Sequence, residues 1–143
     1  MLNISGIENG YVIDHIKAGM CMKIYDALNL SRYDGQVAII RHAKSNKYGK
    51  KDIIKIEGLI DLDLELLGFL DDNITVDVIR NNQIIEKKKL SLPDRIAGVA
   101  VCKNPRCITS IEQELPHVFR LTDREHGVYR CLYCDTKGGK SNL

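Results

Sequence analysis

The 143-residue chain has a formal net charge of +2, with 44% hydrophobic and 28% charged residues. This composition is typical of a globular protein with one ordinary domain or two small ones. The small net charge does not favour a nucleic-acid-binding protein. There is no run of about 18 apolar residues, so no membrane span is predicted.

The first ten residues, MLNISGIENG, lack the basic start and apolar centre of a signal peptide, so the cytoplasm is the expected compartment. The five cysteines agree with this, because a reducing compartment disfavours disulfides. Charge is unevenly distributed: residues 41–55 carry six cations and one acid, and residues 57–77 carry seven acids and no cation. The basic segment suits a compact anion, and the acidic segment suits a solvated surface.

The first part of the chain predicts strands separated by a helix. Residues 11–17 have the aromatic and β-branched content of a strand. Residues 19–30 place Met20, Ile24, Ala27 and Leu28 on one helical stripe. Two further strands are expected, at 35–43 and 51–58, with turn residues between them.

The next elements complete the first predicted domain. Asp61 is expected to cap a helix whose apolar face holds Leu62, Leu66, Phe69 and Leu70. Residues 73–80 then alternate between apolar and polar side chains, as a strand does. Asn81 and Asn82 predict a hairpin turn to a last strand over 83–90, whose poorer pattern indicates a sheet edge.

The order of these elements predicts an α+β fold. The first six form a ferredoxin-like unit, an antiparallel sheet with two helices on one face. SLPDR at 91–95 is expected to be a linker, because Pro93 stops a strand and its neighbours are polar. We therefore expect one domain over residues 1–92 and a small, all-β, zinc-ribbon-like domain over residues 96–143. So short a segment usually needs a metal or disulfides to fold.

Four of the five cysteines have the spacing of a metal site. Cys102 and Cys107 are separated by four residues, Cys131 and Cys134 by two, and 23 residues lie between the pairs. Two such pairs supply four thiolates, which satisfy the tetrahedral preference of zinc. A closed four-sulfur shell leaves no position for a substrate, so the pattern predicts one structural Zn²⁺ per chain.

Other interpretations of the cysteines remain open. The four could be unrelated buried thiols, or Cys131 and Cys134 could form a redox-active pair. A zinc hydrolase would need an open position on the metal. The fifth cysteine, Cys21, lies beside the apolar stripe of the first helix and is expected to be a buried, unreactive thiol.

The charge of the cysteine-rich segment favours a protein partner. Residues 101–143 hold seven Lys or Arg and five Asp or Glu. A Zn²⁺ with four thiolates would add about −2. A nearly neutral domain is a poor phosphate binder, so protein–protein contact is preferred and a nucleic-acid-binding ribbon is the rival hypothesis.

A candidate anion site lies in the first domain. Lys51 and Lys55 fall on one face of a strand, directly after the basic residues of 41–50. Asp14 and His15 could add a ribose acceptor and a phosphate donor, and Lys87 could close the site. Solvated surface lysines are the alternative interpretation. No Walker loop, glycine fingerprint or nucleophile elbow is present, which predicts a binding module joined to a docking module and no enzyme activity.

Several motifs occur together along essentially the whole chain: VIDHI (12–16), GKKDIIKIE (49–57), SLPDRI (91–96) and the cysteine series. In this order the chain resembles the regulatory chains of aspartate carbamoyltransferase. The resemblance implies a noncatalytic allosteric subunit of de novo pyrimidine biosynthesis. Its first domain would form homodimers and bind the nucleoside triphosphates CTP, ATP or UTP. Its zinc domain would dock on catalytic chains, with two catalytic trimers and three regulatory dimers in the holoenzyme.

The resemblance also implies individual site residues. Asp14 is expected at the ribose, His15 near phosphate, and Lys87 at the ribose–phosphate end. Asp77 stands where Asn is common in the family, and its negative charge is expected to weaken triphosphate binding. Asn82 replaces a ring side chain of the well-known enteric type. The four cysteines carry over as zinc ligands. The remaining nucleotide contacts implied are Ile4, Ser5, Gly6, Ile7, Val12, Lys51, Lys55 and Ile84.

Overall fold

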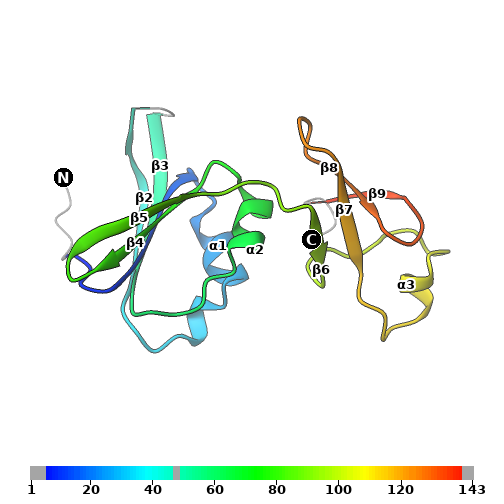
Figure 1. The fold of residues 1–143 in the computed structure, drawn as a ribbon, viewed down its shortest axis with the longest axis horizontal. Helices are drawn as coiled ribbons and strands as arrows, with labels where there is room; N and C mark the ends of the chain where they lie inside the picture. The colour runs from blue at the N-terminus through cyan, green and yellow to red at the C-terminus, as the bar shows by residue number, and fades with distance from the viewer. Residues whose placement is uncertain (1–5, 47–48, 140–143) are drawn as a thin grey trace.

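The structure is a computed structural model that describes residues 6–46 and 49–139. Two of the expected nucleotide contacts, Ile4 and Ser5, lie outside the described residues. Figure 1 shows two lobes, joined by one passage of the chain between β5 and β6. No helix in the described part of the chain is both long enough and apolar enough to cross a membrane.

The first lobe is an antiparallel sheet with helices on one face (Figure 1). Its strand order is β2-β3-β1-β4-β5, which is the predicted ferredoxin-like order with β5 added at one edge. Its elements are β1 (Gly10–Lys17), α1 (Cys21–Ala27), the 3-10 helix η1 (Leu30–Arg32), β2 (Val37–Ser45), β3 (Gly49–Glu57), α2 (Leu64–Leu70), β4 (Thr75–Arg80) and β5 (Gln83–Lys89).

The apolar residues of this sheet alternate with polar ones, and the alternation sets its two faces. Ile13 pairs with both Ile54 and Val76, and all three pack with Ile24 of α1 and Leu67 of α2. Neighbouring residues along each strand point to the opposite face. The helices therefore cover the apolar face, and the other face is left for the polar side chains.

The hairpin between β4 and β5 forms as the sequence predicts. Asn81 and Asn82 have φ angles of 52° and 65°. A tight turn with two positive φ angles matches the twist of the flanking strands, and asparagine tolerates this conformation well.

The helix boundaries differ from the expectation. The prediction of an Asp61 cap was wrong: Asp63 caps α2, and its Oδ1 accepts a hydrogen bond from the backbone N–H of Leu66 at 3.1 Å. An N-cap must directly precede the first turn, and Ile60 and Leu62 instead pack against the core. The first helix is also shorter than the predicted 19–30, since the chain turns at Asn29 with a φ of 55°.

A buried carboxylate holds this lobe together near α1. Asp52 of β3 is 0% exposed, and its oxygens accept backbone N–H groups from Gly19 at 2.8 Å, His42 at 2.9 Å and Cys21 at 3.2 Å. Burial raises the pKa of Asp52, but the hydrogen bonds outweigh it, and the pKa lies below its ordinary value. Asp52 therefore ties the start of α1 to the bulge of β2, where His42 has a φ of 58°.

The second lobe is a small antiparallel sheet with strand order β6-β7-β8-β9. The core of this lobe includes Phe119, Tyr129 and three of the four clustered cysteines. Its elements are β6 (Arg95–Ala97), the one-turn helix α3 (Ile108–Ile111), β7 (Val118–Asp123), β8 (Val128–Cys131) and β9 (Lys137–Gly138).

A side chain of the first lobe completes this second core. Phe69 of α2 is 0% exposed and packs in the second core cluster. Its ring meets that of Tyr129 edge-on, with 5.1 Å between the centroids. The neighbouring Gly68 has no room for a side chain, because a Cβ there would lie 2.3 Å from the carbonyl oxygen of Ser91. The end of α2 thus packs directly against both the second lobe and the chain that leads to it.

The predicted linker is held along its length. Leu92 is 9% exposed, and the hydroxyl of Tyr129 donates to the carbonyl of Pro93 at 2.7 Å. Arg124 donates to the carbonyl of Leu92 and pairs with Asp94, both at 2.8 Å. These contacts fix the segment between the lobes, so it is not a free tether.

Candidate functional site

Four thiols meet in the second lobe. The sulfurs of Cys102, Cys107, Cys131 and Cys134 all lie within 4.8 Å of one another. Cys102 and Cys134 are separated by 3.6 Å, and Cys107 and Cys131 by 3.7 Å. Sulfurs on a tetrahedral zinc with Zn–S bonds of about 2.3 Å lie ~3.8 Å apart. The spacing fits one zinc ion and is far too long for disulfides.

Both cysteine pairs sit on turns with their own hydrogen bonds. In the first turn, the backbone N–H of Cys107 donates to the carbonyl of Asn104 at 3.1 Å. In the second, the N–H of Asp135 donates to the carbonyl of Cys131 at 2.9 Å, and Asp135 has a φ of 65°. Each turn thus aims two sulfurs at one point, as the spacing predicts.

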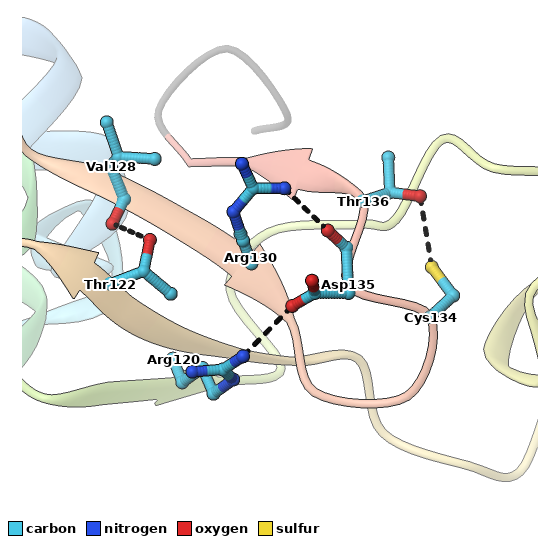
Figure 2. A network of polar contacts seen from close by, with 7 residues as sticks. All are labelled: Arg120, Thr122, Val128, Arg130, Cys134, Asp135 and Thr136. Carbon is cyan, nitrogen blue, oxygen red and sulfur yellow. Dashed lines mark hydrogen bonds and ion pairs between the residues drawn. The ribbon is translucent and has the colours of Figure 1, made fainter.

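Three polar side chains support the cysteines, and none of them was predicted from the sequence. The hydroxyl of Thr109 lies 3.0 Å from the sulfur of Cys107, and that of Thr136 lies 3.2 Å from the sulfur of Cys134 (Figure 2). His117 Nδ1 accepts the backbone N–H of Cys102 at 3.0 Å. Such contacts orient metal ligands. Thr109 and Thr136 each lie two residues after a cysteine, and this spacing in the sequence could have identified them as neighbours of the thiols.

The protonation of the thiols shows why a cation is needed. Burial raises the pKa of Cys102 to about 12, and it raises the pKa of Cys131 as well. Burial also acts against ionisation of Cys134, but hydrogen bonds, led by those from Thr136, lower its pKa to about 6. Without a metal, the thiols of Cys102 and Cys131 therefore favour the neutral form. A divalent cation would supply the charge that stabilises four thiolates in one place.

The fifth cysteine is separate from this cluster. Cys21 is 0% exposed in the core of the first lobe, as predicted. Burial and the neighbouring Asp52 raise the pKa of its thiol, which disfavours the reactive thiolate.

The predicted nucleotide residues come together on the face of the first sheet that the helices leave uncovered. Lys55 pairs with Val12, Val12 with Asp77, and Asp77 with Lys87, so one row crosses β3, β1, β4 and β5. Directly paired residues share a face and lie about 5 Å apart. Ile84 pairs with Ile79 and extends the same face at the edge.

A second row lies beside the first. Asp14 forms an ion pair with Lys51 at 3.0 Å and is paired in register with Thr75. The hydroxyl of Thr75 forms a hydrogen bond with Nδ1 of His15 at 2.9 Å, and the tautomer of His15 decides which of the two donates. His15 reaches Thr75 because β1 bulges there, with a φ of 60°. Thr75 and its partner Lys89 were not predicted as site residues, although both lie two positions from predicted ones on the same strand face.

The charges of this face are mixed. Asp77 is half-buried between Val12 and Lys87. Burial raises the pKa of Asp77, and the nearby Lys87 opposes that shift. Lys51, Lys55, Lys87 and Lys89 therefore share this face with Asp14 and Asp77. Gly6 and Ile7, also predicted contacts, lie just before β1, where Ile7 is buried and Gly6 exposed.

Family models match the chain in two parts. The allosteric domain of the aspartate carbamoyltransferase regulatory chain matches residues 2–91. The metal-binding domain of the same regulatory chain matches residues 94–142. The two matches divide the chain at the same place as the two lobes.

Curated relatives cover nearly the whole chain. An aspartate carbamoyltransferase regulatory chain of Clostridium botulinum is 55% identical over 144 residues, which covers 99% of each chain. That of Clostridium acetobutylicum is 51% identical and covers 99% of this chain and 98% of its own. That of Bifidobacterium longum is 44% identical and covers 94% and 96%.

Proposed function

Because the chain belongs to the family of aspartate carbamoyltransferase regulatory chains, we propose that it is the noncatalytic subunit that links catalytic trimers and carries the effector site. In this proposal residues 1–92 bind nucleoside triphosphates, and residues 96–143 dock on a catalytic chain. Two catalytic trimers and three regulatory dimers form the holoenzyme, which works in the cytoplasm.

The observation that carries the docking proposal is the closed four-sulfur cluster beneath exposed apolar residues. Ile111 is 63% exposed, Tyr133 46%, Ile108 43% and Leu132 39%. All four belong to α3 or to the second cysteine turn, beside the metal ligands. Apolar side chains held outward on a metal-crosslinked scaffold suit a protein interface. With four thiolates bound, the zinc has no open position, so its role is structural and a hydrolase is disfavoured.

The uncovered face of the first sheet supports the effector proposal. Lys51, Lys55 and Lys87 provide cations for a polyphosphate, and Asp14 provides an acceptor for ribose hydroxyls. An effector that binds one quaternary form more tightly shifts the equilibrium between the forms. The activity of the distant catalytic sites changes with that equilibrium.

The edge of the sheet supports self-association. In β5, Ile84 is 52% exposed and Ile85 60% exposed, on a strand with no neighbour on its outer side within the described residues. Exposed apolar residues on an edge strand favour pairing with another chain. We therefore propose that the first lobe forms the homodimer.

The decisive test is to mix the zinc-loaded chain with its catalytic trimers and measure mass by light scattering. We expect a complex of two trimers and three dimers. Aspartate saturation of that complex is then measured with CTP, ATP and UTP in turn. Absence of any complex would refute the docking proposal, and the rival nucleic-acid-binding ribbon would instead bind oligonucleotides with a steep salt dependence.

The effector site is tested by calorimetric titration with triphosphates. Lys55→Ala and Lys87→Ala should each weaken binding, because a charge-assisted contact contributes about 1.5–3 kcal/mol. Asp77→Asn should strengthen it, since a half-buried negative charge beside the phosphates is removed. Unchanged titrations for both lysine variants would exclude this face as the site.

A further inference from the structure

A row of four cations crosses the second sheet. Arg95 of β6 is paired with Arg120 of β7, Arg120 with Arg130 of β8, and Arg130 with Lys137 of β9. Directly paired residues of an antiparallel sheet point to the same face, about 5 Å apart. We call these four residues the basic row; it spans about 14 Å across four strands.

The basic row lies on the outer face of the sheet. Ile96, Phe119 and Cys131 form the neighbouring row, and all three are buried in the core of the lobe. Side chains one position away along each strand must point outward. Arg95, Arg120 and Lys137 are exposed accordingly, and Arg130 is half-exposed.

Little in the described part of the chain compensates these charges. Like charges directly opposite each other in a sheet are destabilising. Asp135 is the one acid that meets the basic row in the described residues: its Oδ1 pairs with Arg120 at 3.0 Å, and its backbone carbonyl accepts from Arg130 at 3.0 Å. Neither Arg95 nor Lys137 has a carboxylate within ion-pair distance in the part of the chain that the structure describes.

The contact with Asp135 shows that the basic row can bind a carboxylate. Figure 2 shows Asp135 between the two guanidinium groups, where its carboxylate forms an exposed ion pair. Guanidinium groups bind carboxylates in a directional, planar geometry. At the ends of the row, the guanidinium of Arg95 and the ammonium of Lys137 offer further positive charge to carboxylates supplied by another protein.

The surroundings favour a folded acidic protein over a nucleic acid. With zinc bound, the lobe is nearly neutral, because four thiolates and one Zn²⁺ contribute about −2. A lobe without excess positive charge gains little of the multiple phosphate contacts on which nucleic-acid affinity depends. Exposed apolar residues also follow the row in the chain, since Leu132 and Tyr133 lie between Arg130 and Asp135. An apolar centre with a charged rim is the usual anatomy of a protein interface.

We propose that the basic row binds an acidic strip on the catalytic chain and sets the rate and salt sensitivity of docking. This inference rests on the proposed function, because it assigns charge to a particular part of the docking surface. Rim charges of this kind act mainly on the association rate, through steering at low ionic strength.

The test measures association of the full-length, zinc-loaded chain with immobilised catalytic trimers at 50 and 500 mM salt. Arg120→Glu combined with Arg130→Glu should slow association about tenfold or more at 50 mM salt and flatten its salt dependence. Arg32→Glu, an exposed charge reversal on η1 in the other lobe, is the control for a charge change away from the basic row and should leave the rate nearly unchanged. Zinc content is measured for every variant.

A second variant acts in the opposite direction and guards against misfolding. Asp135→Asn removes the internal carboxylate but keeps a residue that tolerates the positive φ, so docking should become faster. If the wild-type chain forms no complex, the proposed function fails and the basic row fails with it. If the wild type docks but neither variant changes the association rate, only the basic row is refuted. If the double glutamate variant lost oligonucleotide binding that the wild type has, and docked at an unchanged rate, the proposal would also be refuted. The basic row would then be a nucleic-acid site.

Discussion

The two lobes of this chain reach a stable core by different means. The core of the first lobe is built from apolar side chains of three central strands and both helices, such as Ile13, Ile54 and Leu67. The core of the second lobe is smaller. It needs three cysteines and Phe69 of the first lobe to fill it.

The difference between the two cores explains why the second lobe needs a metal to fold and the first does not. Burial of apolar area scales with the amount of chain available, and a segment of some 50 residues gains little after its conformational entropy is subtracted. The second lobe offsets this deficit with four sulfurs that can be crosslinked by one ion, and with a neighbouring helix that covers its core. We expect the two lobes to respond differently to the same kind of damage.

The largest expected effect comes from loss of the metal. Cys131→Ser leaves three sulfurs, and zinc contributes folding free energy of order 10 kcal/mol in small zinc domains. Hydrogen exchange should then show residues 96–139 unprotected, while the first lobe keeps its protection. Cys21→Ala, which removes the only other thiol, is the control and should leave both lobes protected. If the second lobe stayed protected without zinc, it would not depend on the metal for folding, and the contrast between the two lobes would be wrong.

A smaller effect is expected where the two cores meet. Phe69→Ala should destabilise the second lobe by about 3–5 kcal/mol, because it removes a buried aromatic ring from that core. Denaturant unfolding followed at Tyr129 measures this loss. Leu66→Ala on the same helix is the control, since Leu66 is half-buried and belongs to neither core cluster. Equal losses in both variants would show that α2 does not complete the second core.

The smallest expected effect concerns the buried carboxylate of the first lobe. Asp52→Asn should cost about 1–3 kcal/mol at pH 7, because an amide cannot accept all three backbone N–H groups. The folded pKa of Asp52 is depressed, so its contribution is present above the unfolded pKa of about 3.9 and is lost as the pH falls through the folded pKa.

Urea unfolding of the wild type and the variant at pH 7 and in acid checks this sign. The stability difference should shrink at low pH, whereas Asp26→Asn, on the exposed side of α1, should show little difference at either pH. A difference that does not depend on pH would rule out the ionised form of Asp52 as the stabilising species.

Local pattern was sufficient for most elements of the first lobe. The alternation of Ile74, Val76 and Val78 gave the strand face, and Asn81 and Asn82 gave the hairpin turn, because both signals depend on neighbouring residues only. The helix cap was misplaced by two positions, from Asp63 to Asp61. Both are carboxylates in an acidic, leucine-rich stretch, and only packing of Ile60 and Leu62 against the core decides between them.

The sequence alone determined the metal ligands and the family, since cysteine spacing and long motifs are properties of the chain order. Only the tertiary structure decided how distant segments meet. Phe69 entered the core of the other lobe, three backbone amides converged on Asp52, and four cations from four strands formed one row. Each of these arises from strand register and from packing between elements far apart in the chain, which local propensity does not encode.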